Sequence, residues 1–289
     1  MALSRDKILA AVKKADSLPS VPDLIMQLEK ELRKPHPSIA EVTKIIEQDP
    51  SLSANLLRIT NSAFYRRTRE TTTVRQAMMR LGFEEVRRMA TAAVLVDGYK
   101  GFAGGNPKLY WGHCMAVSLA CRAVAEFCTH EFSKDDIELV FTAGLLHDLG
   151  VLALYHLFPK EYAELMQTVL EKGGIAHDAE VNAWDIDHGE VGEVLTRRWK
   201  LPEPICQVAR FHHRPWLCAD EHRSLIWLVH ISNFICNNQG YGRKESGFPD
   251  AFDHGAWDAL GLSLNQVPEI IEKVQEEGER SATFINAFN

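Results

Sequence analysis

The sequence predicts an all-α fold of two helical lobes, and three observations support this class. Apolar residues recur at intervals of three and four along most of the chain, which is the spacing of amphipathic helices. The strict alternation that is typical of strands is hard to find in any segment. Four glycines and a proline fall within ten residues and indicate a junction between two sets of helices: Gly98, Gly101, Gly104, Gly105 and Pro107.

The N-terminal helices are predicted from their apolar spacing and from the residues that start and stop them. An apolar series over 21–32 is followed by two prolines that end it. Ser38 with Glu41 three residues later is typical of a capping box, and Asp49-Pro50 is typical of a helix start. We therefore expect residues 1–100 to form an N-terminal helical subdomain, with helices over 21–32, 38–48, 50–60, 73–81 and 83–96.

Beyond the junction, longer apolar helices are predicted. We expect residues 101–240 to form a helical core, with helices near 108–129, 135–156, 159–172, 178–184, 188–199, 203–213 and 221–238. The segment 240–258 has the composition of a loop, and 263–279 has the pattern of a last amphipathic helix. Residues 241–289 are therefore expected to form a C-terminal loop and helix that pack on the core.

Composition and charge exclude several classes of protein. The chain has 289 residues, 46% of them hydrophobic and 25% charged, which are ordinary values for a globular protein. A net charge of -7 argues against a protein that coats nucleic acid. Six cysteines without a C-x-x-C pair suit a reducing compartment, and the charged N-terminus has no signal-peptide core. We therefore expect a cytoplasmic protein.

One apolar stretch, 139–158, has the length of a membrane span. It contains His147 and Asp148 near its centre, and such groups are costly in lipid. We therefore expect a buried helix here and no association with a membrane.

Histidines are the residues most suited to chemistry. Five of the twelve share a place on or beside helical faces that should be buried: His113, His147, His188, His212 and His213. A single such histidine is usually an ordinary core residue, but five together with Asp148 would all lose solvation, and a shared metal compensates that loss. Imidazole and carboxylate ligands suit iron, manganese, nickel or zinc. The small residues Ala143 and Gly144 would let a neighbouring helix approach closely enough to complete the cluster.

The order of these residues resembles the HD superfamily of metal-dependent phosphohydrolases, in which a first histidine precedes an HD doublet, here within GLLHDLG. The closer resemblance is to the HDOD family, the HD-related output domain of bacterial signalling proteins. It rests on LPSVP at 18–22, IIEQDPSLSANLLRITNSAFY at 45–65 and TTVRQAMMRLGFEEVRRM at 72–89. It covers about residues 16–238 and implies an N-terminal helical subdomain packed on an HD-like core.

The sequence departs from the HD pattern at positions that matter for hydrolysis. The last metal-ligand aspartate falls on Asn233, a weaker ligand, and the lysine expected three places after Asp148 is Val151. Hydrolysis of a phosphate ester needs a metal-activated water and positive charge facing the phosphate. We expect a single ion on His147, Asp148 and one or two further histidines rather than a full pair, because only one carboxylate remains to offset the charge of two dications. An empty site is the other alternative, and Asn233 is expected at the edge of the pocket.

Two functions follow from these residues. The first is a signalling or regulatory module for binding and output, whose partners are signalling proteins or a small nucleotide-like ligand. The second is a metal-dependent phosphohydrolase acting on a nucleotide or a cyclic dinucleotide. Asn233 and Val151 favour the first, and the five histidines keep the second open.

Arginines are concentrated between Arg58 and Arg88, where eight of them stand against three glutamates and give a net charge of +5. A solvated helical face is the ordinary explanation, and a docking surface for an acidic partner is the alternative. The chain has no glycine-rich phosphate loop and no motif for reading DNA, so we do not expect a nucleic-acid partner. We predict that part of one arginine set is exposed on one side and binds an acidic partner: Arg66, Arg67, Arg69, Arg87 and Arg88.

Overall fold

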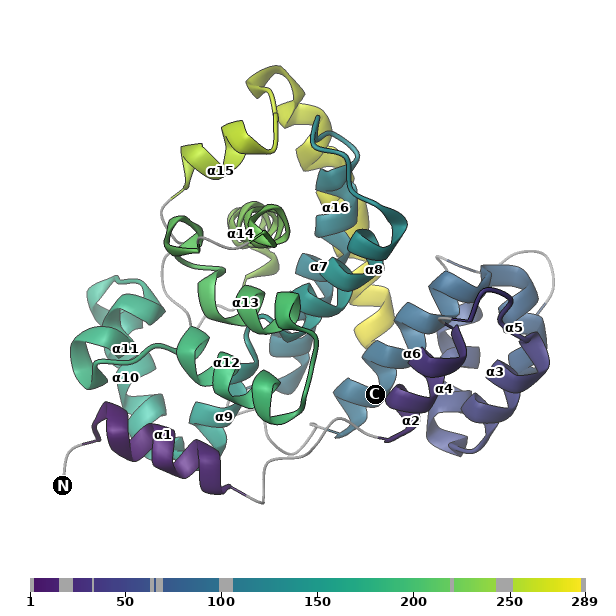
Figure 1. Ribbon diagram of the computed structural model, residues 1–289, viewed down its shortest axis with the longest axis horizontal. Coiled ribbons are helices and arrows are strands. Elements are labelled where there is room, and N and C mark those ends of the chain that lie inside the picture. Colours follow the sequence, from purple (N-terminus) through teal and green to yellow (C-terminus); the bar gives the residue numbers. More distant parts are fainter. Residues whose placement is uncertain are drawn as a thin grey trace. The chain divides into compact units, whose positions relative to one another are not determined.

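The computed structural model describes residues 3–15, 23–32, 34–62, 65, 70–98, 106–218, 221–242 and 252–286. Every regular element in these ranges is a helix, so the predicted all-α class is confirmed (Figure 1). The chain divides into two compact units, each described separately below. The larger unit comprises Met1–Leu18 and Phe102–Glu279, and the smaller unit comprises Pro19–Gly101 and Arg280–Asn289.

The smaller unit is built from α2 (Asp23–Leu32), α3 (Ile39–Glu47), α4 (Pro50–Thr60), α5 (Val74–Leu81), α6 (Phe83–Gly98) and the last turns of α16 (Val267–Asn286). The predicted helix starts are confirmed. The Ser38 hydroxyl accepts from the backbone N–H of Glu41, and the Asp49 carboxylate accepts from two N–H groups of α4. These side chains satisfy donors that a helix start leaves without partners.

A charged cluster lies inside the smaller unit. Arg88 donates to Glu85 at 2.7 Å, and Arg280 of α16 also pairs with Glu85. The Tyr65 hydroxyl donates to the same carboxylate at 2.7 Å. Because this carboxylate receives two guanidinium groups and a hydroxyl, it ties the end of α16 to α6 within the unit.

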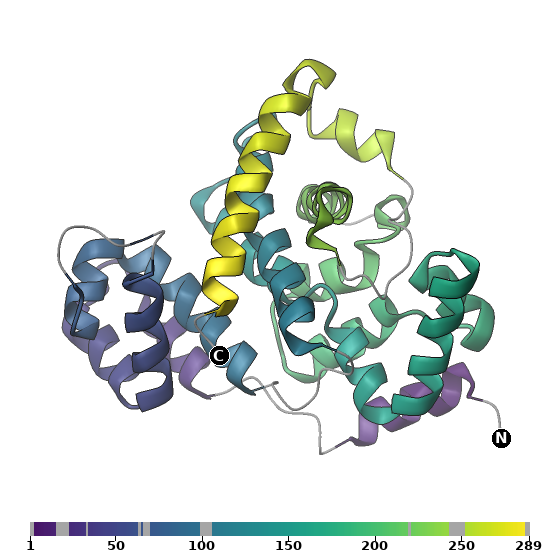
Figure 2. The same ribbon diagram turned by 180° about the vertical axis from the view of Figure 1, so that it is seen from behind.

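The larger unit holds α1 (Arg5–Lys14), α7 (Pro107–Ala125), α8 (Lys134–Leu146), α9 (Leu149–Leu157), α10 (Pro159–Lys172), α11 (Ala176–Trp184), α12 (His188–Arg198), α13 (Glu203–Phe211), α14 (Arg223–Cys236), α15 (His254–Ala259) and most of α16, which is one uninterrupted helix (Figure 2). A 3-10 turn over Pro215–Leu217 and a π turn over Asn237–Tyr241 complete it. Helix α7 packs on α8 and α14, and α12 packs on α9 and α13. These helices surround the histidines.

The structure corrects the sequence-based expectation in several places. The single helix expected over 135–156 is two helices, α8 and α9, which are separated at His147 and Asp148. Helix α1 was not expected; it groups with the larger unit, where Ile8 and Val12 are fully buried. Helix α15 lies in the segment that was expected to be a loop. The two compact units therefore differ from the expected ranges 1–100, 101–240 and 241–289 at both ends of the chain: Met1–Leu18 groups with the larger unit, and Arg280–Asn289 groups with the smaller one. Of the predicted junction, residues 99–105 lie outside the described residues.

Residues Lys134–Leu157 contain an 18-residue window that is long enough and apolar enough to cross a membrane, with a mean hydropathy of 1.7. Within the fold, 78% of that window is buried. That burial is what a core helix pair shows, in agreement with the expectation of a buried segment.

Candidate metal centre

Asp148 is the centre of the candidate site, and a break in the helix puts it there. His147 ends α8, Asp148 has non-helical torsion angles of φ -94° and ψ 12°, and α9 begins at Leu149. The His147 ring bonds to the carbonyl of Gly144 within α8 at 2.6 Å. Both residues are buried, so the adjacent imidazole and carboxylate are fixed side by side in the core.

The two oxygens of Asp148 face two groups of imidazoles. Oδ2 lies 3.6 Å from Nε2 of His113 and 3.5 Å from Nε2 of His147. Oδ1 lies 3.3 Å from Nε2 of His188 and 3.5 Å from Nε2 of His212. All four imidazoles are at most 3% exposed. One buried carboxylate therefore lies between four ring nitrogens that come from four segments of the chain.

Three of these imidazoles are oriented by backbone carbonyls. Nδ1 of His113 bonds to the carbonyl of Tyr241 at 2.9 Å, and Nδ1 of His212 bonds to that of Ala209 at 3.0 Å. His147 bonds in the same way to Gly144. A carbonyl accepts but cannot donate, so the proton of each ring is on Nδ1 and the lone pair of Nε2 is directed toward Asp148.

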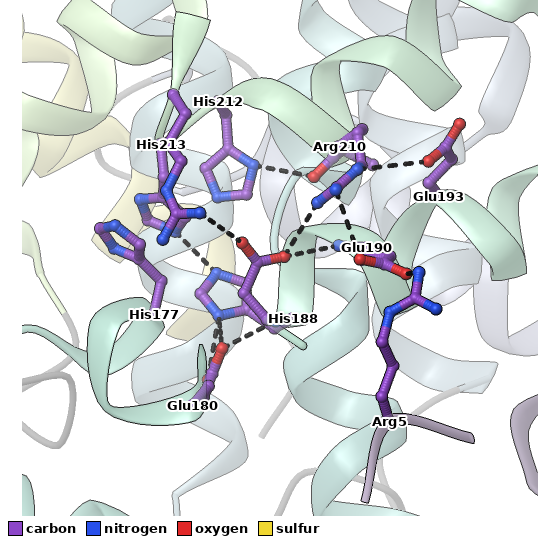
Figure 3. Close-up of polar contacts among 12 residues, drawn as sticks. Arg5, His177, Glu180, His188, Glu190, Glu193, Arg210, His212 and His213 are labelled. Atoms are coloured by element: carbon purple, nitrogen blue, oxygen red, sulfur yellow. Dashed lines mark hydrogen bonds and ion pairs between the residues drawn. The ribbon is translucent and has the colours of Figure 1, made fainter. Parts of the chain in front are cut away.

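His188 is oriented by a carboxylate instead. Glu180 of α11 is fully buried, and its Oε2 lies 2.8 Å from Nδ1 of His188 (Figure 3). The same oxygen accepts from the backbone N–H of His188 at 2.7 Å, and Tyr162 donates to Oε1 at 2.6 Å. Sequence reasoning missed Glu180, because a glutamate on a helix is normally expected to face solvent and no local pattern connects it with His188.

His213 lies on the outer side of the cluster. Its Nε2 is 2.7 Å from Nε2 of His188, and its ring stacks on that of His177 with centroids 4.5 Å apart (Figure 3). His213 is partly exposed, in contrast to the four buried imidazoles. We refer to His188, His212 and His213 as the Oδ1 group, and to His113 and His147 as the Oδ2 group. The structure thus brings together all five predicted histidines and Asp148.

Asn233, the remaining predicted residue, is buried in α14, and its side-chain oxygen accepts from Asn237 at 3.1 Å. Helix α14 adjoins the cluster through His230, whose Nδ1 lies 2.8 Å from the carbonyl of His212. Sequence reasoning also missed His177, whose ring stacks on that of His213, and His230, which neighbours the cluster through His212.

Close helix packing makes the convergence possible. A Cβ atom at Gly150 would lie 1.9 Å from the carbonyl oxygen of His188, so α9 and α12 touch through backbone. A Cβ atom at Gly144 would lie 3.0 Å from Cα of Ser118 on α7, which agrees with the close approach expected at this position. Two glycines thus bring the helices that carry Asp148 and the histidines into contact.

The histidines differ in protonation. Burial lowers the pKa of His147 to about 3, although the Asp148 carboxylate opposes the shift. Burial also acts to lower the pKa of His188, but the carboxylates of Glu180 and Asp148 outweigh it and raise that pKa to about 10. In the metal-free protein at neutral pH, His147 is neutral and His188 is an imidazolium that shares its protons with the two carboxylates.

The donor set fits a divalent metal. The Nε2 atoms of His147 and His212 are buried without a protein hydrogen-bond partner, which is costly in a protein interior unless an ion or an ordered water satisfies them. Distances of 3.3–3.6 Å from these and the other nitrogens to Asp148 match the ligand-to-ligand edges of about 3.3–3.4 Å in a tetrahedron with bonds of 2.0–2.1 Å. Imidazole nitrogen with one carboxylate is a ligand set of first-row divalent ions.

The arginines beside the cluster are already neutralised. Arg210 reaches Asp187 at 3.2 Å, Glu190 at 3.3 Å and Glu193 at 3.5 Å (Figure 3). Arg214 lies 3.6 Å from Asp178 and also approaches Asp187. Val151, at the position where the HD pattern has a lysine, is buried in α9. These side chains therefore offer little positive charge to a phosphate group.

The predicted arginine surface is corrected where the structure describes it. Arg88 is buried and paired with Glu85, so it is part of the internal cluster of the smaller unit. The Arg87 side chain is 13% exposed and lies 4.0 Å from Glu84. Arg66, Arg67 and Arg69 lie outside the described residues. A buried guanidinium that holds a carboxylate cannot also face a partner, so Arg88 is a structural residue.

Comparison with known proteins agrees with this architecture. The chain is similar in fold to an HDOD domain protein with unknown function from Geobacter sulfurreducens (TM-score 0.75, 24% identity, covering 94% of this chain and 98% of that one). It is also similar to a proposed signal transduction protein from Marinobacter aquaeolei VT8 (TM-score 0.76, 19% identity, 98% and 65%). A proposed phosphohydrolase from Shewanella amazonensis SB2B has the same fold (TM-score 0.73, 21% identity, 98% of each chain).

The chain spans less than half the length of the curated relatives that it matches. It is 23% identical over 228 residues to an uncharacterized protein from Treponema pallidum (strain Nichols), which covers 78% of this chain and 44% of that protein. The family model for the HDOD domain matches residues 18–215, which include helices α2 to α6 of the smaller unit and the histidine cluster. The chain belongs to the HDOD family.

Proposed function

We propose that this protein is a cytoplasmic regulatory module for binding and output, and that it holds a divalent metal in its histidine cluster without hydrolysing a phosphate ester. The observation that carries the proposal is the burial of the donors: four imidazoles surround the two oxygens of Asp148, and all five residues are at most 3% exposed. A structural or regulatory metal needs such a closed set of ligands, whereas a catalytic metal keeps one position open to water and substrate.

The charge around the cluster supports the same proposal. A metal in this site would be held by Nε2 atoms of the histidines and by the Asp148 carboxylate. When bound, a first-row dication can act as a Lewis acid and can lower the pKa of a bound water. Stabilisation of the negative charge that develops on a phosphate needs further cations. Arg210 and Arg214 are held by carboxylates, and Val151 offers no charge.

The output role draws on the family and on its neighbours. One similar structure is that of a proposed signal transduction protein, and the chain matches only part of longer relatives. We propose that the partners are signalling proteins or a small nucleotide-like ligand, and that an occupied metal site stabilises the form that binds them.

A metal-dependent phosphohydrolase is the second candidate, because one side of the cluster is not closed. His213 is partly exposed and contacts His188, so a substrate could approach the Oδ1 group from this side. A proposed phosphohydrolase shares the fold.

Metal analysis and activity assays on wild type and Asp148→Asn test the proposal. Protein purified without chelators should contain bound first-row metal, and Asp148→Asn should contain much less. Wild type should not hydrolyse bis-p-nitrophenyl phosphate or cyclic dinucleotides in added manganese or iron. Nucleotides and cyclic dinucleotides should be screened by thermal shift with and without metal, and a ligand that needs the metal to bind would support the regulatory role.

Hydrolysis that is abolished by Asp148→Asn would replace the regulatory proposal by the phosphohydrolase. A wild-type protein that neither contains metal nor shows a thermal shift with manganese, iron, nickel, cobalt or zinc would overturn the metal site itself.

A further inference from the structure

We propose that the two groups of histidines are not equivalent: the Oδ1 group binds the first metal ion, and Glu180 is the positioning residue that makes this group the tighter one. The inference rests on the proposed metal binding and assigns the order in which the cluster fills. It also names a ligand set different from the one that the sequence favoured, which was centred on His147.

The first argument is the number of donors. Asp148, His188, His212 and His213 can each offer one ligand atom, and these four atoms all lie within 4.8 Å of one another. The Nε2 atoms of His188 and His213 are 2.7 Å apart, which is a hydrogen-bond distance, so an ion bound by both replaces the proton between them. On the other side, His113, His147 and Asp148 offer three. Four protein donors complete the tetrahedral shell that a closed metal site requires, and three do not.

The second argument is charge. Neutral backbone carbonyls accept hydrogen bonds from Nδ1 of His113, His147 and His212. Nδ1 of His188 hydrogen-bonds instead to the charged carboxylate of Glu180. A dication bound to His188 would therefore lie close to two carboxylates, Asp148 directly and Glu180 through the ring. A buried ion needs such compensation, and a carboxylate on the far nitrogen also makes the imidazole a stronger ligand.

The third argument is the way in which Glu180 is held. Its side chain is fully buried and bonds to the ring and the backbone N–H of His188 and to the hydroxyl of Tyr162. Its two contacts with His188 fix both the position and the rotation of that ring.

The fourth argument is access. His213 is the partly exposed member of the cluster, and it touches His188 directly. The Oδ1 group is thus the one with a ligand at the protein surface, whereas His113 and His147 are buried. This difference bears on how fast the first ion binds, and the preceding arguments bear on how tightly it binds.

A matched pair of variants tests the order of filling. His212 and His147 are both fully buried, both rest on a helix carbonyl through Nδ1, and both have Nε2 atoms without a hydrogen-bond partner. They differ in the oxygen of Asp148 that they face. In titrations of metal-free protein with Co²⁺, His212→Gln should weaken binding of the first ion by about 100-fold or more, and His147→Gln should change it by less than about 3-fold.

A second pair isolates Glu180. Glu180→Gln keeps the shape of the side chain and removes its charge. It should lower the affinity for the first metal ion by about 10- to 100-fold. Asp187→Asn is the control, because Asp187 is a buried carboxylate next to His188 in the sequence that caps α12 and pairs with Arg210. It should leave the affinity within about 3-fold. Glu180→Gln should also change the visible spectrum of the first bound Co²⁺, which a loss of fold stability alone would not do.

A measurement on wild type keeps the test independent of variants that fail to fold. With half an equivalent of Zn²⁺, the ¹⁵N resonances of the His188 and His212 rings should shift, and those of His113 and His147 should not. The proposed order is wrong if His147→Gln lowers the affinity for the first metal ion as much as His212→Gln does, or if the His147 resonance shifts first. Either result would leave the proposed metal binding intact. If wild type binds neither Co²⁺ nor Zn²⁺, the proposed function fails together with this inference.

Discussion

Replacing Gly150 by alanine should damage the larger unit at the place where α9 meets α12. The added Cβ would lie 1.9 Å from the carbonyl oxygen of His188 and 2.8 Å from the backbone nitrogen of Gly192. Both atoms belong to the backbone, so no side-chain rotation can relieve the clash, and α12 has to move as a whole.

The magnitude follows from this geometry. Overpacking a core typically costs about 1–3 kcal/mol, and a clash with rigid backbone belongs at or above the upper end of that range. Alanine recovers about 0.5–1 kcal/mol of helix propensity. We therefore expect Gly150→Ala to lower the free energy of unfolding by about 2 kcal/mol or more. Because the displaced carbonyl belongs to His188, the variant should also bind Co²⁺ more weakly.

Urea unfolding followed by tryptophan fluorescence measures this loss of stability in the larger unit, which contains Gly150. All six tryptophans of the sequence lie between residues 111 and 257, within the larger unit. With a typical slope of about 2 kcal/mol per molar urea, the transition should move down by about 1 M.

Gly112→Ala is the matched control. Gly112 lies within α7, and a Cβ atom there would meet nothing within 4 Å. This variant should be as stable as wild type, or more stable by up to about 1 kcal/mol. If Gly150→Ala unfolds at the same urea concentration as wild type, the close approach of α9 and α12, and the positioning of His188 that depends on it, are wrong.

Three further predictions concern the smaller unit. Burial acts to raise the pKa of Glu85, but the charges of Arg280 and Arg88 outweigh it and hold the pKa below the ordinary value of 4.5. The Glu85 carboxylate therefore stabilises the fold above pH 4.5, and this stabilisation is lost as the pH falls through the lowered pKa. Circular dichroism melts should therefore show a stability that falls below pH 4.5 in wild type and a flatter dependence in Glu85→Gln; equal slopes would contradict the assignment. Arg88→Ala should lower the free energy of unfolding by about 3 kcal/mol, because it removes a buried partner of Glu85. Arg75→Ala, on the exposed side of α5, should change the free energy of unfolding by less than about 0.5 kcal/mol. Equal effects of the two substitutions would mean that Arg88 is a surface residue. Asp49→Ala should lower the stability by about 1 kcal/mol in the same melts, because the α4 cap is lost. Asp49→Asn should lower it much less, because asparagine can also cap a helix. An equal loss of stability in Asp49→Asn would show that the charge of Asp49, and not capping, is the cause.

Local interactions explain why much of the fold could be predicted from the sequence. Helix starts at Ser38 and Asp49 depend on hydrogen bonds to backbone groups two or three residues away, so short sequence windows contain all the atoms involved. The apolar spacing of helices such as α10, predicted over 159–172 and observed over Pro159–Lys172, reflects burial of one face. The same reasoning placed five histidines and Asp148 on faces that had to be buried.

Tertiary structure decided what these residues do together. Glu180 becomes part of the site because α11 folds back on the start of α12, a contact that no sequence spacing encodes. The break between α8 and α9 puts both oxygens of Asp148 within reach of imidazoles from four segments, although the apolar pattern runs on without interruption. Arg88 looked like a surface charge until the fold brought Glu85 and Arg280 to it. Local hydrogen bonding and burial are encoded in neighbouring residues, whereas the partner of a buried charge is chosen by long-range packing, and for that reason only the folded chain shows it.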